Sequence, residues 1–424
     1  MTNVGYNVIN NVEGFLALLN FKYKYYDFTE ENEMPEESNF DTIPVGRLGI
    51  VALESCKELG EKVNNYLVKW RDERKNEHKT TIAFNGYERD NYLISHACPR
   101  FGSGESKGII KESVRGTDLY ILVDVLNHSL EYSLSGTKCK MSPDDHYADV
   151  KRVIAAVGGK ARKITVIMPF LYESRQHKRS TRESLDCALA LQELCSLGVE
   201  NIITFDAHDP RVQNAIPLKG FENVQPTYQF IKALLRSTND LEINKDHMMV
   251  ISPDEGAMNR AIYFANVLGV DVGMFYKRRD YTTIVNGRNP IVAHEFLGDS
   301  VEGKDVIIID DMISSGESML DVARELKKRK AKRVFALATF GLFTNGLEIF
   351  DKAKEEGLIE KVITTNVTYQ SPELLSRDWY VSSDLSKYIA LLIDRLNHDT
   401  SISDILDPTE KIQARIQEYI AERK

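Results

Sequence analysis

The residues with the clearest chemical potential lie in VIIIDDMISSGESM, residues 306–319. A buried strand over Val306–Ile309 is expected to run into Asp310 and Asp311, followed by a loop of small residues and a helix that starts near Ser318. Backbone N–H groups and hydroxyls at a helix N-terminus suit a phosphate dianion. Carboxylates would repel a phosphate, but they accept hydrogen bonds well from the hydroxyls of a neutral polyol. The segment therefore predicts a sugar-phosphate site, with an Asp-rich turn before a Ser-capped helix as the alternative.

Two further polar side chains follow apolar runs. His208 comes after NIITF and lies between Asp206 and Asp209, and Asp254 comes after MMVIS. The plainer interpretations are a histidine satisfied by its acidic neighbours and an acid that caps a helix. Together, however, two such positions at strand ends would suit a shared magnesium triphosphate, because Mg²⁺ often keeps several waters and needs few protein ligands.

A basic pair lies at another strand end. Lys277 and Arg279 follow VDVGMFY and precede a stretch rich in Thr, Asn and Gly. Phosphoryl-type transfer relies on positioning and charge neutralisation, which calls for Mg²⁺, Lys and Arg. A flexible loop here could close over phosphates and exclude water. The alternative is a solvated basic patch.

The elements that must position these residues alternate between strand and helix from Leu48 onward. Compact apolar runs end in polar or turn residues, and most are followed by a helical pattern, as expected for parallel sheets covered on both faces. The sequence predicts an α/β protein with two tandem domains built on mainly parallel sheets, with ligands at the carboxyl ends of the strands. The six longest runs are DLYILVDV, KITVIMPF, NIITFDAH, HMMVISPD, DVIIIDDM and RVFALATF.

Composition limits the classes of function. Of 424 residues, 42% are apolar, and 54 basic residues against 63 acidic ones give a net charge of −9, which disfavours general nucleic-acid binding. Five cysteines without a close CxxC pair argue against disulfides or a Cys-rich zinc site. No basic leader precedes the N-terminal apolar stretch, and no apolar run approaches the ~20 residues needed to span a bilayer. We expect a cytoplasmic protein without membrane partners.

Four segments fall outside the repeating pattern. Residues 1–45 read as an N-terminal extension with a linker and a short helix over Val12–Asn20. The charge run at 69–79 is expected to be a solvated helix end. Residues 129–146 resemble a loop longer than usual, and residues 406–424 a separate C-terminal helix with a packing or assembly role.

The strand–Asp–Asp–loop–helix pattern resembles the phosphoribosyl-binding loop of type I phosphoribosyltransferase folds. Five further segments occur in the order typical of the ribose-phosphate pyrophosphokinase family: RFGSGESKGIIKESVRGTDLYIL, MPFLYESRQHKR, TFDAHDPRVQ, VISPDEGAMNRA and FYKRRDYT. The resemblance covers about Leu48 to Ile405, with insertions near residues 74–92 and 130–143. It implies two type I phosphoribosyltransferase-like domains, at 46–222 (plus about 378–405) and 223–377.

The resemblance also implies an activity and roles for individual residues. The activity is transfer of the β,γ-diphosphate of ATP to O1 of ribose 5-phosphate, with Mg²⁺ as cofactor, in a homo-oligomer whose ATP site is completed by a neighbouring subunit. The implied residues are, for catalysis, Lys277, Arg279 and His208; for ATP, Phe101, Glu105, Arg175 and Gln176; for ribose 5-phosphate, Asp310, Asp311, Ser314, Ser315, Gly316 and Ser318; and for the metal, His208 and Asp254.

The chain departs from the family pattern at several of these places. Ser103 and His177 each replace a common Asp near the adenine, which bears on base selectivity. Glu317 places a carboxylate beside the expected phosphate socket, and Phe340 stands where a histidine is frequent. Two other functions remain open at this point: a phosphoribosyltransferase that consumes the activated sugar, and a non-catalytic regulatory homologue.

Overall fold

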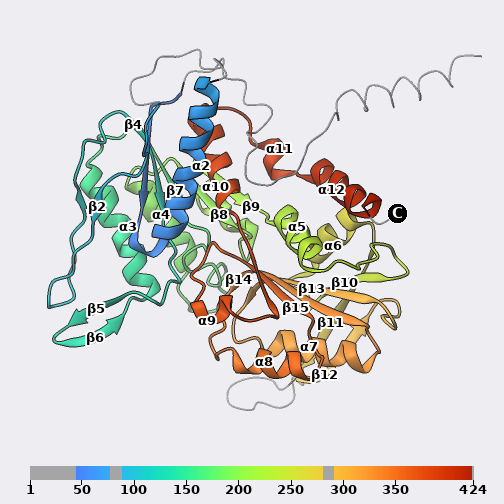
Figure 1. Ribbon diagram of the computed structural model, residues 1–424. Helices are drawn as coiled ribbons and strands as arrows, with labels where there is room; N and C mark the ends of the chain where they lie inside the picture. Colours follow the sequence, from blue (N-terminus) through green and yellow to red (C-terminus); the bar gives the residue numbers. More distant parts are fainter. Residues whose placement is uncertain (1–43, 77–87, 280–290, 423–424) are drawn as a thin grey trace, which may run out of the picture. The chain divides into compact units, whose positions relative to one another are not determined.

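The computed structural model describes residues 44–76, 88–279 and 291–422, with the backbone alone at 75–76, 277–279 and 291–294. The described part contains two large sheets, each flanked by helices (Figure 1). The extension at 1–43 and its expected helix over Val12–Asn20 lie outside the described residues.

The first sheet has five strands, and every neighbouring pair is parallel. Three of its strands coincide with the predicted runs DLYILVDV, KITVIMPF and NIITFDAH, one lies where the predicted alternation starts near Leu48, and the edge strand at Gly220–Val224 was not predicted. In spatial order they are β1 (Arg47–Ala52), β4 (Thr117–Leu122), β7 (Lys163–Ile167), β8 (Asn201–Phe205) and β9 (Gly220–Val224).

The second sheet has seven strands, parallel except for the β11–β12 pair at one edge. In spatial order they are β12 (Ile291–Leu297), β11 (Asp271–Arg279), β10 (Met248–Ser252), β13 (Asp305–Ile313), β14 (Arg333–Gly341), β15 (Lys361–Thr365) and β16 (Tyr380–Ser383). Strand β13 is longer than Val306–Ile309, so Asp310 and Asp311 belong to the strand itself rather than to the loop that follows.

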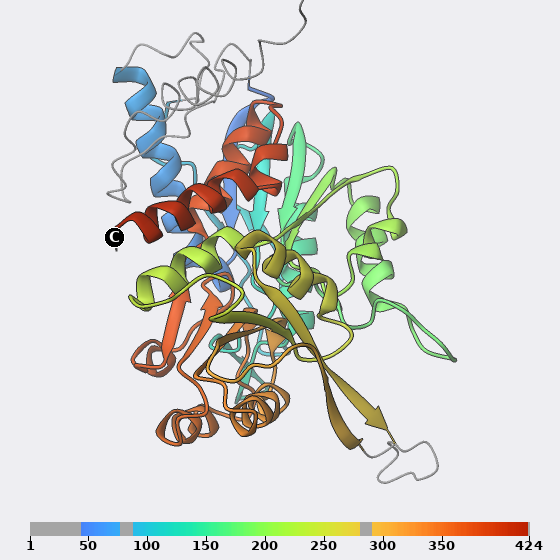
Figure 2. The same cartoon turned by 90° about the vertical axis from the view of Figure 1, so that its right-hand side faces the viewer.

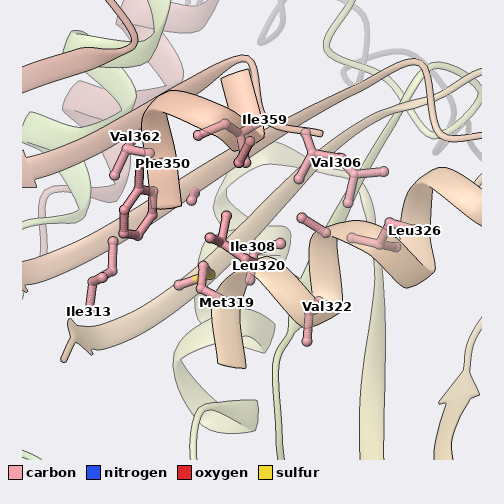
Figure 3. Close-up of a cluster of buried hydrophobic side chains, with 14 of the residues drawn as sticks. Val306, Ile308, Ile313, Met319, Leu320, Val322, Leu326, Phe350, Ile359 and Val362 are labelled. Atoms are coloured by element: carbon pink, nitrogen blue, oxygen red, sulfur yellow. The ribbon is translucent and has the colours of Figure 1, made fainter. Parts of the chain in front are cut away.

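Alternation along β13 explains why its sequence is continuously apolar. Val306 and Ile308 belong to one buried cluster, shown in Figure 3, whereas Ile307 and Ile309 belong to a second cluster. Successive side chains of a strand point to opposite faces, so both faces of this sheet are covered. At ~25 cal/mol per Å² of buried apolar surface, such residues contribute most of the stability that fixes the strand's position.

Helices and short hairpins connect the strands. None of the described helices combines the length and apolarity needed to cross a membrane, and all five cysteines are free. The helices are η1 (Glu54–Cys56), α2 (Lys57–Asn76), α3 (Pro143–Val157), α4 (Asp186–Ser196), η2 (Pro210–Ala215), α5 (Thr227–Ser237), α6 (Met258–Leu268), α7 (Glu317–Lys328), α8 (Glu348–Glu355), α9 (Pro372–Leu375), α10 (Ser386–Asn397), α11 (Ser403–Leu406) and α12 (Thr409–Ala421).

The prediction that the charge run at 69–79 is a solvated helix end is wrong for the part that the structure describes. Helix α2 lies beside α10 (Figure 1), and two of its arginines are buried there. Arg74 donates to Asp394 at 2.6 and 3.1 Å, and Arg71 donates to the same carboxylate at 3.3 Å. The partner is more than 300 residues away in the sequence, so a local charge pattern could not reveal the pairing.

The segment expected to be a long loop at 129–146 is also ordered differently. It forms a hairpin of β5 (Glu131–Leu134) and β6 (Thr137–Lys140) and then enters α3. Ser135 and Gly136 connect the strands with φ of 49° and 84°, as two-residue hairpin turns require. A second small hairpin pairs β2 (His96–Ala97) with β3 (Ile109–Ile110).

The C-terminal part contributes to both halves of the molecule. Strand β16 pairs with β15 in the seven-stranded sheet, so the return toward the first sheet comes after Ser383 and not near residue 378. Helix α10 then packs on α2. Helix α12 lies along α5 and α6 (Figure 2), and its residues Ile412, Ile416 and Tyr419 are buried in the core on that face of the seven-stranded sheet. The predicted packing role of the last helix is therefore confirmed.

Candidate functional site

Residues from the ends of both sheets meet at one place. His208 follows β8 of the five-stranded sheet, and Asp311 lies near the end of β13 of the seven-stranded sheet. The Nδ1 atom of His208 lies 2.6 Å from Oδ2 of Asp311. A carboxylate can only accept, so the imidazole donates through Nδ1, and Nε2 is the nitrogen that remains for a ligand. Two residues 103 positions apart are thereby joined where parallel sheets place ligands.

This hydrogen bond shifts both partners toward their charged forms. It is the main cause that raises the pKa of His208 above its ordinary value, against a smaller opposing effect of burial. Burial pushes the pKa of Asp311 upward, but the bond from His208 and the positive charge of Arg260 outweigh burial and leave the pKa below its usual range. The pair is thus a charge-assisted hydrogen bond, among the stronger polar contacts in proteins.

A second ion pair stands beside the first. Arg260, from α6, donates to the two carboxylate oxygens of Asp206 at 2.7 and 2.9 Å, and Thr339 Oγ1 donates to the same carboxylate at 2.7 Å. Asp206 is buried, follows β8, and has a φ of 42°, a left-handed conformation that Asp tolerates better than most residues. The strained residue is held by donors from α6 and β14, so the pair fixes the end of one sheet against the other.

The ionised form of Asp310 is disfavoured, unlike that of the adjacent Asp311. Burial, followed by repulsion from Asp311 and Asp254, raises its pKa well above the ordinary value, although Arg260 opposes the shift. The Nη1 atom of Arg260 lies 3.8 Å from Asp310 Oδ1. Arg260 interacts with Asp206 and Asp311 as well as with Asp310. Hydroxyl donors or a cation from a ligand would therefore stabilise the ionised form of Asp310.

The expected phosphate loop has the predicted backbone form. Residues 314–316 leave β13, and α7 starts at Glu317 with Gly316 as its N-cap residue at a φ of 92°. A Cβ at Gly316 would come within 2.4 Å of the Phe350 ring, so only glycine fits. The carbonyl of Ser314 accepts from the N–H of Thr344 at 3.0 Å, which anchors the loop's start. Glu317 is exposed and accepts from Asn345 at 3.3 Å, away from the loop backbone.

Among the residues expected at the nucleotide, Arg175 acts electrostatically on the His208–Asp311 pair. Its positive charge lowers the pKa of His208, so it lies within electrostatic reach of the pair. Gln176 donates to the carbonyl of Ser184 at 2.8 Å, which holds the segment before α4. Phe101 and Glu105 lie instead on a turn packed against the β5–β6 hairpin.

The remaining predicted residues are Lys277, Arg279 and Asp254, and the structure describes the side chain of Asp254 alone. Strand β11 ends at Arg279, and Lys277 pairs in register with His294 of β12. The side chains of Lys277 and Arg279, like residues 280–290, lie outside the described residues. Asp254 begins the turn before α6, where its Oδ1 accepts the N–H groups of Gly256 and Ala257 at 2.9 and 3.3 Å. These bonds form a turn ahead of the helix, whose N-cap residue is Ala257 without a side-chain cap, so the capping alternative for Asp254 is not met.

The comparisons with known proteins agree with this geometry. Residues 48–198 match the family model described as the N-terminal domain of ribose phosphate pyrophosphokinase, and residues 219–373 match that of the phosphoribosyl transferase domain. The chain belongs to the ribose-phosphate pyrophosphokinase family. The resemblance inferred from the sequence motifs is confirmed.

Individual relatives extend the match over most of the chain. Proteins named ribose-phosphate pyrophosphokinase from Vibrio parahaemolyticus and Shewanella oneidensis are 30% and 31% identical to it, over 72% of this chain and 88% of each relative. The crystal structure of phosphoribosylpyrophosphate synthetase from Mycobacterium smegmatis has a TM-score of 0.63 at 21% identity, covering 82% of this chain and 98% of that one. The predicted fold class, two phosphoribosyltransferase-type α/β domains, is confirmed as well.

The family's motifs drew attention to some residues of the site and not to others. Arg260, Asp206 and Thr339 were not predicted, although Arg260 and Asp206 lie inside two of the matched segments. The sequence did contain a signal for both residues. An acid directly after a β-strand and an arginine early in a helix are candidates for a functional site when they lie beside residues expected to bind a ligand. Their pairing was not readable, since 54 residues separate them.

His177, which replaces a common acid of the family, also lies at the site. Its ring centroid is 5.3 Å from that of His208, and its Nε2 is 3.6 Å from Asp209 Oδ2. Burial lowers the pKa of His177. Arg211 donates to Asp209 and is the main cause that lowers the pKa of Asp209 to about 2. The position of the substituted residue therefore carries a neutral ring in place of an acid.

The donor set is compatible with a metal that takes few protein ligands. Among the residues that the structure describes, no three His, Cys, Asp or Glu side chains form a ready-made metal cluster. Magnesium, however, is usually held by one or two side chains together with substrate phosphates and waters. Asp310 lies within electrostatic reach of Asp311 and Asp254, and a divalent cation would relieve the repulsion from these two acids.

Proposed function

We propose that this chain transfers the β,γ-diphosphate of ATP to O1 of ribose 5-phosphate and so forms phosphoribosyl pyrophosphate and AMP. The observation that carries the proposal is the 2.6 Å contact of His208 with Asp311, which brings the ATP-side motif of one sheet to the sugar-side motif of the other. Family membership supports the same reaction, since relatives that share 72% of the chain carry the name of this activity.

On the sugar side, each group has a role that follows from its charge. The backbone of the loop at 314–316 and the start of α7 would bind the 5-phosphate, because helix N-termini favour anions. Ser314, Ser315 and Ser318 add hydroxyls at the same place. Asp310 and Asp311 would accept hydrogen bonds from the ribose hydroxyls, which keeps the carboxylates away from the phosphate.

On the ATP side, we assign Arg175 and Gln176 to the nucleotide and His208 and Asp254 to a magnesium triphosphate. Bound Mg²⁺ would supply charge neutralisation at the bridging phosphate oxygens. His208 would be oriented for this role by Asp311, because the Nδ1 bond fixes the ring and leaves Nε2 toward the ligand. Repulsion by Asp310 and Asp254 would position the metal rather than a second anion at these strand ends.

The chemistry itself needs no protein nucleophile. The ribose O1 hydroxyl attacks the β-phosphorus of ATP, the bond from that phosphorus to the α,β-bridging oxygen breaks, and AMP leaves. We assign Lys277 and Arg279 to the charge that develops on the transferred group, since both stand where β11 ends.

Phe101 and Glu105 are assigned to the nucleotide of a neighbouring copy. Their turn packs on the β5–β6 hairpin of the same chain, and the resemblance to the family supplies the expectation that it reaches the nucleotide of a neighbouring subunit. The proposal therefore includes a homo-oligomer, and we place the protein in the cytoplasm with the nucleotide metabolism it would serve.

Incubation with ATP, ribose 5-phosphate and Mg²⁺ tests the proposal directly. AMP and a pentose carrying a diphosphate should form together, and neither should form without ribose 5-phosphate. A phosphoribosyltransferase would release pyrophosphate from phosphoribosyl pyrophosphate and a nucleobase, with no use for ATP. A regulatory homologue would be inactive alone. Either of these results, obtained with folded protein, would replace the proposal.

A further inference from the structure

The turn at residues 100–106, which carries Phe101 and Glu105, is closed by local contacts but leaves the Phe101 ring largely at the surface. The N–H of Phe101 donates to the carbonyl of Glu105 at 2.7 Å, and the N–H of Gly104 donates to the carbonyl of Phe101 at 2.9 Å. The Phe101 side chain is 51% exposed. A large apolar ring presented to solvent on a short turn needs outside contacts if it is to keep one conformation.

The β5–β6 hairpin supplies such contacts. The N–H of Ser135, at the tip of the hairpin, donates to the carbonyl of Gly102 at 2.8 Å. Leu134 lies directly on the bare backbone of Gly104, where a Cβ would come within 2.8 Å of Leu134 Cδ1. Gly104 has a φ of 89°, so the residue is glycine both for its conformation and for this close approach.

The other side of the turn is clamped by Arg100. Its Nη2 atom donates to Asp149 of α3 at 2.9 Å, and its guanidinium group lies 5.1 Å from the centre of the Tyr132 ring. Arg100 thus ties the turn to a helix of the main fold and to β5 at once. A cation over a tyrosine face adds attraction beyond simple contact.

The hairpin belongs to neither large sheet, and most of its residues are exposed. An isolated two-stranded hairpin is marginal in water. Its Tyr132 and Leu134 side chains contact the 100–106 turn, and it falls in the segment expected from the sequence to be an insertion. Tyr132, Leu134 and Ser135 contact Arg100, Gly104 and Gly102, respectively. The hairpin therefore makes three separate contacts with one turn.

We propose that the β5–β6 hairpin is a positioning element that holds the 100–106 turn in the form that presents Phe101 and Glu105 to a purine nucleotide bound by a neighbouring copy. The inference rests on the proposed function for the identity of the ligand. Tyr132 and Leu134 are positioning residues: they touch the turn, and the turn touches the nucleotide.

The double variant Tyr132→Leu/Leu134→Ser tests this in the full-length protein, with each single variant as a safeguard. Lys138→Ala is the matched control, because Lys138 lies on the same hairpin, is 86% exposed and pairs with Glu131 of that hairpin. Two quantities are measured: hydrogen–deuterium exchange of peptides covering residues 99–107, and steady-state kinetics of AMP release. The melting temperature reports whether each variant is folded.

The expected result is faster exchange in the 99–107 peptides and a KM for ATP raised about 3- to 10-fold, the cost of ordering one or two side chains anew at an interface. The kcat and the KM for ribose 5-phosphate of the double variant should equal the wild-type values. The Lys138→Ala protein should match wild type in both exchange and kinetics. If hydrogen–deuterium exchange in the 99–107 peptides were unchanged, the proposal that the hairpin holds the turn would be wrong. Faster exchange with an unchanged KM for ATP would overturn the nucleotide role. If the wild-type protein released no AMP, the proposed function would be wrong. The exchange measurement would still show whether the hairpin holds the turn.

Discussion

Exchanging Arg260 for glutamine removes the cation that holds Asp206 at the junction of the two sheets. In the wild-type protein Asp206 is 2% exposed and accepts from Arg260 at 2.7 and 2.9 Å and from Thr339 at 2.7 Å. Arg260 itself is 14% exposed, so solvent screens the pair little. After Arg260→Gln, Asp206 would be a buried carboxylate with a hydroxyl as its one retained donor.

Breaking a buried ion pair by removing one partner costs roughly 3–5 kcal/mol, because the other charge stays buried. For a domain of this size, each kcal/mol lowers the melting temperature by about 2–4 °C. The variant should therefore melt ~6–20 °C below wild type, as the product of these two ranges. The KM for ribose 5-phosphate should rise as well, because loss of Arg260's charge pushes the pKa of Asp310 further up.

Differential scanning calorimetry at pH 7.5 measures the first effect, and AMP release measures the second. The double variant Asp206→Asn/Arg260→Gln is the control that separates them. It removes the stranded charge and keeps a residue that tolerates the φ of 42°. We expect it to recover much of the melting temperature but none of the affinity for ribose 5-phosphate, since Asp310 still lacks Arg260.

Two results would refute this reasoning. If Arg260→Gln melted with the wild-type protein, the pair would not stabilise the junction. If the double variant melted no higher than Arg260→Gln alone, the loss would come from packing of the arginine stem rather than from an unpaired buried carboxylate.

Three other predictions concern the loop, the acids and the pH dependence. Gly316→Ala should cost roughly 2–5 kcal/mol and raise the KM for ribose 5-phosphate, because φ is 92° and the new Cβ would overlap a buried ring; a wild-type denaturation curve would contradict the loop geometry. Lys277→Ala should reduce kcat by orders of magnitude with ribose 5-phosphate binding retained, whereas Asp310→Asn with Asp311→Asn should weaken mainly the sugar; isothermal titration and AMP release distinguish the two patterns. Burial raises the pKa of Asp124 from 3.8 to about 7. The folded protein therefore holds a proton that the unfolded chain releases, and this contribution to stability is full below pH 3.8 and lost by about pH 7. Urea unfolding between pH 5 and 8 should show this slope, with a loss of roughly 3 kcal/mol over that range, and Asp124→Asn should flatten it.

Local patterns in the sequence were sufficient for most strands of the two large sheets, whereas the strands at 220–224, 361–365 and 380–383 were not predicted. The run of apolar residues at 306–309 indicated a strand covered on both faces, and the two acids with the small residues after it predicted a sugar-phosphate site, which stays a prediction. These features were readable because each depends on neighbours within about ten residues. The 129–146 hairpin was missed although its turn residues, Ser135 and Gly136, were a usable signal.

Tertiary structure alone decided which charges meet. Arg74 is a buried cation paired with Asp394, whereas Arg260 pairs with Asp206 and lies near Asp310, one of the acids predicted to bind the sugar. Tertiary structure also decided that His208 is oriented by Asp311 and that an inserted hairpin lies on the Phe101 turn. Such contacts join residues tens to hundreds of positions apart, and their strength depends on burial and distance, which no local pattern encodes.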